Sequence, residues 1–240
     1  MVPPDFQELA RRLAQARLCL LFTPELCGER PPLEVLEAAL PWLDLIQVRV
    51  KSPASGSPGP ARRSGPTALG PAEARATYDW TVRVLELLSA RGSEALCTVD
   101  DRVDVARALQ ASGCAGVHVG QEDCPPALAR QVLGEHALVG LSTHSAEEVV
   151  EALDEPVDYL GFGPFRPTAT KGYERGVGAG ATWVAANAAG RPVFPIGGID
   201  LDAVGELADI GRAAVSSAIL AAPDPGEAAR ALRAALDCAP

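Results

Sequence analysis

The sequence predicts an α/β fold, a (β/α)8 TIM barrel that forms a single domain over residues 1–240, and three observations carry this prediction. Short β-branched or Leu-rich runs alternate with Ala-rich amphipathic runs, which is the pattern of repeated strand–helix units around a parallel sheet. The length of 240 residues suits one such barrel, which commonly has about 250 residues. The apolar share of 48% contains few aromatic residues, so an interior of Ala, Val, Leu and Ile is expected.

Eight apolar runs are strand candidates, and eight is the number that closes this barrel. They lie at 18–22, 43–48, 94–99, 116–119, 138–141, 157–161, 193–196 and 213–216. The helix candidates lie near 32–41, 72–91, 102–112, 125–134, 145–153, 179–189, 201–209 and 225–237, and an extra N-terminal helix is expected at 5–17. An open doubly wound sheet is the alternative, although no Gly-x-Gly-x-x-Gly follows the first strand.

Residues 52–71 form a stretch rich in Pro, Gly and Ser. Linkers between domains have this composition, but this stretch follows the second strand inside one barrel. A flexible loop near the mouth of the barrel is therefore expected.

The composition limits the partners and the location of the protein. A net charge of −10 argues against sequence-independent binding to nucleic acid, which needs a basic face. No run approaches 18 apolar residues, and no signal peptide begins the chain, so we expect a cytoplasmic protein that does not bind membranes. The six cysteines form no Cys-x-x-Cys pair, and reduced, buried thiols are expected at Cys19, Cys97 and Cys114. A homo-oligomer remains possible.

Polar side chains at the ends of two predicted strands indicate a phosphorylated substrate. Gln47, Arg49 and Lys51 share one face of the second strand, and in a barrel that face is the interior or its rim. A loop with Thr168, Thr170 and Lys171 follows the sixth strand, and its hydroxyls and ammonium group suit an anion. A plain surface turn is the alternative for this loop taken alone.

Carboxylates follow the third and fourth predicted strands. Asp100 and Asp101 end one strand, and Asp123 follows the next. Because Mg²⁺ prefers a few carboxylates together with substrate phosphate oxygens, these residues are candidates to share one ion. Capping of the following helix is the competing explanation for Asp100 and Asp101. His118 is interpreted as a packed imidazole.

A second anion site is predicted at strands seven and eight. Gly197–Gly198 and Ser216–Ser217 match the place where barrels of this kind hold a phosphate with backbone N–H groups. The first site, with Arg49, Lys51, Lys171 and the metal, suits a pyrophosphate. This second site, built from backbone N–H groups, suits a monophosphate.

Six motifs run in order from residue 47 to residue 199, within a match that extends from about residue 18 to 220. They are Gln-x-Arg-x-Lys, Asp-Asp-Arg-Val-Asp, Gly-Val-His-Val-Gly-Gln-Glu-Asp, Gly-Leu-Ser-Thr-His, Gly-Pro-Phe-Arg-Pro-Thr-Ala-Thr-Lys and Ile-Gly-Gly-Ile. This ordered set closely resembles the thiamine phosphate synthase family. The resemblance implies a (β/α)8 barrel that joins hydroxymethylpyrimidine pyrophosphate to a thiazole phosphate and releases pyrophosphate.

The resemblance also implies a role for each matching residue. Gln47 would face the pyrimidine, and Ser142 would contact the pyrimidine and the leaving group. The pyrophosphate would be bound by Arg49, Lys51 and Lys171, and Mg²⁺ by Asp101 and Asp123. The thiazole phosphate would be bound by Thr168, Thr170, Gly198, Ser216 and Ser217.

The chain departs from the family in two places. Asp100 replaces the usual Asn beside the pyrophosphate, which adds negative charge near an anion, and the 52–71 stretch is longer than expected. Two other functions therefore stay open. One is a tautomerase-like enzyme in which His144 is the acid or base, and the other is a non-catalytic sensor of a phosphorylated ligand.

Overall fold

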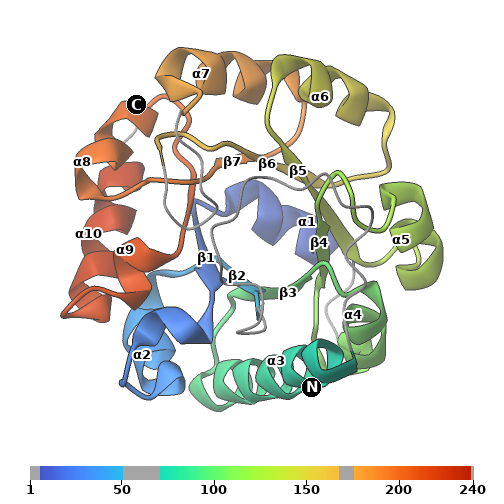
Figure 1. Cartoon of the computed structure of the whole chain (residues 1–240), viewed down its shortest axis with the longest axis vertical. Helices are drawn as coiled ribbons and strands as arrows, with labels where there is room; N and C mark the ends of the chain where they lie inside the picture. The colour runs from blue at the N-terminus through green and yellow to red at the C-terminus, as the bar shows by residue number, and fades with distance from the viewer. Residues whose placement is uncertain (1–5, 51–70, 168–175, 239–240) are drawn as a thin grey trace.

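The structure, a computed structural model, describes residues 6–50, 71–167 and 176–238. Eight parallel strands lie in the order β7-β6-β5-β4-β3-β2-β1-β8. A single bridge between Ile196 and Ala214 joins the two end strands, so the predicted barrel is confirmed and is nearly closed. Figure 1 looks along the barrel and shows the helices in a ring around the strands. Within the described ranges, no helix is long and apolar enough to cross a membrane.

The strands and helices alternate along the chain as the sequence predicts. The strands are β1 (Leu18–Phe22), β2 (Leu45–Val48), β3 (Leu96–Asp100), β4 (Gly116–Val119), β5 (Leu138–Thr143), β6 (Tyr159–Phe162), β7 (Val193–Pro195) and β8 (Ala213–Val215). The α-helices are α1 (Phe6–Gln15), α2 (Pro32–Ala39), α3 (Pro71–Arg91), α4 (Val103–Leu109), α5 (Pro126–Leu133), α6 (Ala146–Glu151), α7 (Gly178–Ala188), α8 (Leu201–Val204), α9 (Ser217–Leu220) and α10 (Pro225–Asp237).

Several boundaries differ from the prediction, and two of them matter for the site. Asp100 and Ser142 lie inside β3 and β5, because both strands continue further than their apolar runs. Helix α9 is a single turn after β8 that the sequence analysis missed, and the predicted helix at 201–209 is divided into α8 and a 3-10 turn. The flexible loop predicted at 52–71 falls outside the described residues, except that Pro71 begins α3.

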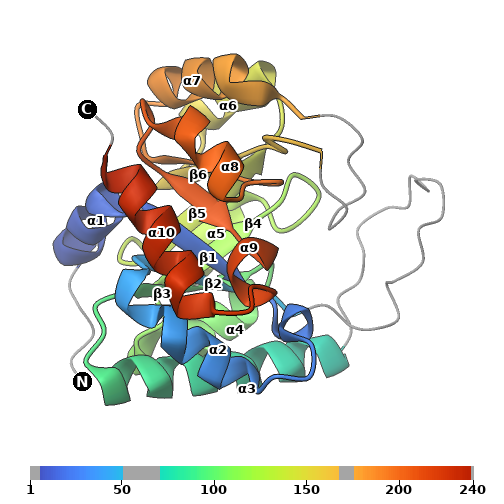
Figure 2. The ribbon, with the colours of Figure 1, turned by 90° about the vertical axis from the view of Figure 1, so that its left-hand side faces the viewer.

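Two apolar clusters fill the space on either side of the barrel wall. Ile46 and Val48 of β2 belong to the cluster under the helices, whereas Leu45 belongs to the cluster inside the barrel. Leu9 and Leu13 of α1 join the inner cluster, so the extra N-terminal helix closes the end of the barrel where the strands begin (Figure 2). The six cysteines are free, as expected for reduced thiols, and four of them are buried.

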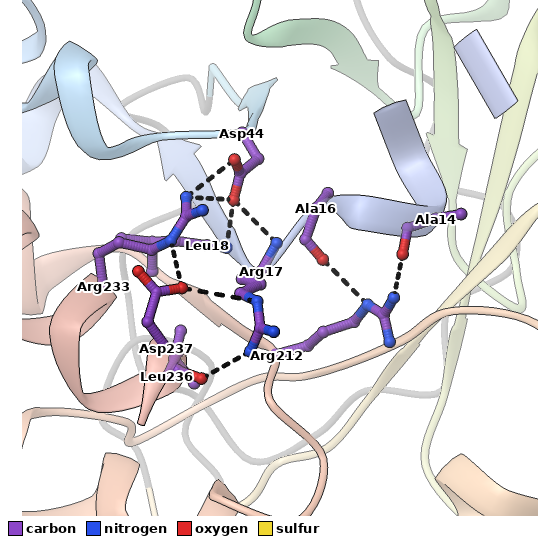
Figure 3. A network of polar contacts seen from close by, with 9 residues as sticks. All are labelled: Ala14, Ala16, Arg17, Leu18, Asp44, Arg212, Arg233, Leu236 and Asp237. Atoms are coloured by element: carbon purple, nitrogen blue, oxygen red, sulfur yellow. Dashed lines mark hydrogen bonds and ion pairs between the residues drawn. The ribbon is translucent and has the colours of Figure 1, made fainter. Parts of the chain in front are cut away.

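A polar network ties the chain together at the N-terminal ends of the strands (Figure 3). One oxygen of Asp44, just before β2, accepts backbone N–H bonds from Arg17 (2.8 Å) and Leu18 (3.0 Å) at the start of β1. Arg233 of α10 donates to the same carboxylate at 2.8 Å. Asp44 therefore joins β1, β2 and the last helix, far from the strand ends that carry the predicted chemistry.

Asp44→Asn is expected to lower the free energy of unfolding by about 2–3 kcal/mol, because it leaves Arg233 with Asp237 as its one carboxylate partner and places amide hydrogens next to the N–H donors that Asp44 accepts from. Urea unfolding measures this change. Asp79→Asn is the matched control, since its pair with Arg75 is exposed on α3 and should change stability by less than about 0.5 kcal/mol. Equal effects of the two substitutions would contradict the role given to Asp44.

Candidate active site

Three polar side chains from β2 and the end of β3 meet inside the mouth of the barrel. The register pairs Gln47 with Thr98, so Arg49, just past the end of β2, lies level with Asp100. The Gln47 amide donates to one carboxylate oxygen of Asp100, and Arg49 Nε lies 3.3 Å from the other. Gln47 and Arg49 are 4% and 8% exposed, which confirms that this face of the strand points inward. Asp100 thus orients the amide and offsets the charge of Arg49.

A second polar pair joins β4 to β5. His118 Nε2 lies 2.9 Å from Ser142 Oγ, and the His118 ring packs 5.3 Å from the ring of Tyr159 on β6. Gly140 stands between these two rings in the sheet, because it pairs with His118 on one side and Tyr159 on the other. His118 is a packed imidazole, as the sequence analysis interprets it, and it also holds the Ser142 hydroxyl.

Gly140→Ala is expected to lower kcat more than tenfold and to destabilise the protein by about 1–3 kcal/mol. A Cβ atom at this position would lie 2.4 Å from His118 Nδ1 and 2.3 Å from Tyr159 Cζ, so the ring that holds Ser142 must move. Steady-state kinetics and thermal unfolding measure the two effects.

Gly180→Ala on α7 is the matched control for Gly140→Ala, since nothing lies within 4 Å of its added Cβ. We expect it to keep full activity and to gain a little stability from the higher helix propensity of Ala. If Gly140→Ala were as harmless as this control, the tight packing described around His118 would be wrong.

A cavity of about 660 Å³ opens between the C-terminal ends of the strands. Its lining includes Arg49, His144, Arg166, Gly198, Ser216 and Ser217. Ser216 Oγ donates to the carbonyl oxygen of Leu21 at 2.8 Å, so its proton is not directed at a ligand. His144 Nδ1 lies 2.6 Å from the carbonyl oxygen of Gly163, which can only accept, so this ring nitrogen is the donor.

The two predicted metal-binding carboxylates lie after neighbouring strands. The backbone N–H of Asp101 donates to the carbonyl oxygen of His118 at 2.8 Å, which ties the end of β3 to β4. Asp123 Oδ2 accepts from the N–H of Gly120 at 2.9 Å. Asp101 has a φ of 59°, an uncommon conformation for a residue other than Gly. Arg102, the residue at the N-cap of α4, makes no side-chain cap hydrogen bond.

The structure brings together only part of the predicted site. Gln47, Arg49 and Asp100 are in contact, and Gly198 and Ser217 line the same cavity as Arg49. Four predicted residues lie outside the described ranges: Lys51, Thr168, Thr170 and Lys171. Arg166 also lines the cavity, although the sequence around it, rich in prolines and threonines, does not predict a site residue there.

Comparisons with known proteins identify the family. The family model described as thiamine monophosphate synthase matches residues 18–219, which include all eight strands and every residue that lines the cavity except Ala221. The chain belongs to this family. A thiamine-phosphate synthase from Mycobacterium sp. (strain KMS) is 41% identical over 235 residues, covering 95% of this chain and 96% of the relative.

Solved structures agree with this assignment. A thiamine phosphate pyrophosphorylase from Pyrococcus furiosus superposes with a TM-score of 0.74 at 30% identity, covering 95% of this chain and 98% of that one. A 3-hexulose-6-phosphate synthase superposes with a TM-score of 0.60 at 16% identity, covering 91% and 99% of the two chains, and this likeness supports the barrel fold alone. The thiamine monophosphate synthase family is thus supported by motifs, whole-chain similarity and fold.

Proposed function

We propose that this protein is a thiamine phosphate synthase, a transferase that joins hydroxymethylpyrimidine pyrophosphate to thiazole phosphate and releases pyrophosphate. The observation that carries the proposal is the position of Arg49. Its guanidinium pairs with Asp100 inside the barrel mouth, and the same residue lines the cavity that holds Gly198 and Ser217. We infer that this one cation lies between the leaving pyrophosphate and the site for the monophosphate.

The reaction needs positioning and charge stabilisation more than a nucleophilic side chain. The bond between the pyrimidine methylene carbon and a pyrophosphate oxygen breaks, and the oxygen keeps the electron pair. The thiazole nitrogen supplies the electron pair of the new carbon–nitrogen bond. Gln47 orients the pyrimidine, Ser142 contacts the pyrimidine and the leaving group, and His118 fixes the direction of the Ser142 hydroxyl.

The charged and polar groups divide between the two phosphorylated substrates. Arg49, with Lys51 and Lys171 from outside the described residues, stabilises the leaving pyrophosphate. The thiazole phosphate is bound near Gly198, Ser216 and Ser217, together with the undescribed Thr168 and Thr170. Because the Ser216 hydroxyl already donates to Leu21, a contact with phosphate would use its backbone.

Asp101 and Asp123 fit a magnesium ion in their donor chemistry. Mg²⁺ is usually held by one or two carboxylates together with substrate phosphate oxygens, and these two residues follow adjacent strands. The described residues contain no larger cluster of three or more Asp, Glu, His or Cys side chains that suits a metal. When bound, the ion would offset the charge that develops on the leaving pyrophosphate.

Asp100→Asn is expected to raise kcat/KM for the pyrimidine pyrophosphate by about tenfold. The Asn oxygen can still accept from Gln47, while the loss of the carboxylate frees Arg49 and removes a charge that opposes the substrate. Kinetics at saturating thiazole phosphate measure the change. Asp104→Asn, whose partner Arg102 lies outside the cavity lining, is the control and should change nothing.

An unchanged or lower kcat/KM for Asp100→Asn would contradict this view of Asp100. It would mean that the carboxylate is needed to hold Gln47 and Arg49, or that it binds the metal. Asp in place of the usual Asn at position 100 would then be an adaptation of this protein.

Incubation with both substrates and Mg²⁺ tests the proposed function, with chromatography to detect thiamine phosphate. A synthase forms it only when both substrates are present. Rearrangement of the thiazole alone would indicate the tautomerase-like alternative with His144, and ligand binding without product would indicate the sensor. The cytoplasmic location, the absence of a nucleic-acid partner and the oligomeric state stay predictions.

A further inference from the structure

Arg166 adds a cation to the cavity where the thiazole phosphate is proposed to bind. It follows β6 and lines the cavity together with Gly198, Ser216 and Ser217. Its side chain is 37% exposed, so the guanidinium lies at the edge of the site in contact with solvent. Arg49, the other cation in the described lining, is already paired with Asp100 inside the mouth.

The backbone of Arg166 is fixed beside the Gly197–Gly198 turn. Its N–H donates to the carbonyl oxygen of Gly197 at 3.0 Å. Gly198 has a φ of 67°, and a Cβ atom there would lie 2.9 Å from the Cβ of Arg166. The two strand ends therefore fit together only because residue 198 has no side chain, and the arginine side chain starts directly above the turn.

Two carboxylates hold the guanidinium, and they differ in what else they do. Asp200 lies 3.8 Å away, and its carboxylate is committed to the start of α8, where it accepts backbone N–H bonds at 3.1 and 2.9 Å. Glu206, in the 3-10 turn Gly205–Leu207, binds the guanidinium directly and is 47% exposed. Glu206 is thus the partner that can be exchanged, because water screens this pair and separation costs little.

We propose that Arg166 binds the phosphate of the thiazole substrate and that Glu206 is the carboxylate it exchanges for that phosphate. This inference rests on the proposed function. A phosphate dianion carries more charge than Glu206 and can accept two parallel bonds from the planar guanidinium, so it is the stronger partner. Glu206 then lowers the affinity for phosphate, because each binding event must break the resting ion pair.

A structural tie between the loop after β6 and the turn after α8 is the competing explanation of the same ion pair. The two explanations differ in the sign of one effect. If the pair only holds the loop, removal of either partner weakens phosphate binding. If Arg166 is a phosphate ligand, removal of Arg166 weakens binding and removal of Glu206 strengthens it.

Calorimetric titration with thiazole phosphate, and separately with inorganic phosphate, tests the inference in Arg166→Gln, Glu206→Gln and the double variant. We expect Kd to rise about tenfold in Arg166→Gln and to fall about threefold in Glu206→Gln. The double variant should match Arg166→Gln, because the gain from Glu206→Gln passes through Arg166. Arg230→Gln, which breaks an exposed pair with Glu227 on α10, is the control and should leave Kd unchanged.

Three results would overturn the inference: a higher Kd in both single variants, an unchanged Kd in Arg166→Gln, or a gain from Glu206→Gln that persists without Arg166. This third result would mean that the negative charge of Glu206 repels the phosphate directly and that the ion pair with Arg166 has no part in the effect. These titrations are done without the pyrimidine substrate, so they measure binding in the absence of catalysis. A chain that bound phosphate through Arg166 yet formed no thiamine phosphate would refute the proposed function and leave this inference standing.

Discussion

Chelation of Mg²⁺ by EDTA is expected to stop the formation of thiamine phosphate, and added Mg²⁺ is expected to restore it. A pyrophosphate leaves with several negative charges, and the described part of the cavity lining offers only Arg49 and Arg166 as arginine or lysine cations, both already paired with carboxylates. Asp101 and Asp123 are two carboxylates that follow the adjacent strands β3 and β4. Initial rates measured over a range of free Mg²⁺ concentrations test the requirement.

Asp123→Ala is expected to raise the Mg²⁺ concentration needed for half-maximal rate by at least about tenfold, which corresponds to the loss of one charged ligand. Glu122→Ala is the matched control, since it removes a neighbouring exposed carboxylate from the same loop and should keep the normal dependence. Near-normal activity of Asp123→Ala at ordinary Mg²⁺ would show that the two carboxylates do not share the ion.

Lys171→Ala and Ser217→Ala are expected to have different kinetic signatures. A lysine that stabilises the leaving pyrophosphate acts mainly in the transition state, so its removal should lower kcat by about 10²-fold or more. Ser217 lines the cavity proposed for the thiazole phosphate, so Ser217→Ala should chiefly raise the KM for that substrate.

Steady-state kinetics with each substrate varied in turn separate the two signatures. Lys171→Arg should recover part of the lost kcat, because it restores the charge without the shape of the ammonium group. The reverse pattern, with a raised thiazole KM in Lys171→Ala and a lowered kcat in Ser217→Ala, would mean that the two anion sites have been exchanged.

The sequence predicts the barrel well because its signal is local. Apolar runs of four to six residues mark each strand, and the alternation along Gln47, Val48 and Arg49 is enough to tell the inner face from the outer. Of the polar residues predicted at strand ends, Gln47, Arg49 and Asp100 meet inside the mouth, where the C-terminal ends of parallel strands lie together.

The contacts inside the site are not local, and the sequence does not predict them. The meeting of Arg49 with Asp100 depends on the register between β2 and β3, which pairs Gln47 with Thr98. The space for the His118 ring depends on Gly140, which lies between His118 and Tyr159 in the sheet and has no side chain. Arg166 reaches the site because the loop after β6 lies over the Gly197–Gly198 turn, a contact between segments about 30 residues apart in the sequence.

Pyrophosphate and thiamine phosphate measured in the same reaction give the most direct test of the proposed chemistry at the barrel mouth. With both substrates and Mg²⁺ present, the two products should appear in equal amounts at every time point, because one bond breaks for each bond that forms. Neither product should appear when the thiazole phosphate is left out. Pyrophosphate release that continued at the same rate without the thiazole phosphate, or an absence of thiamine phosphate at saturating substrates, would contradict the assignment of this protein as a thiamine phosphate synthase.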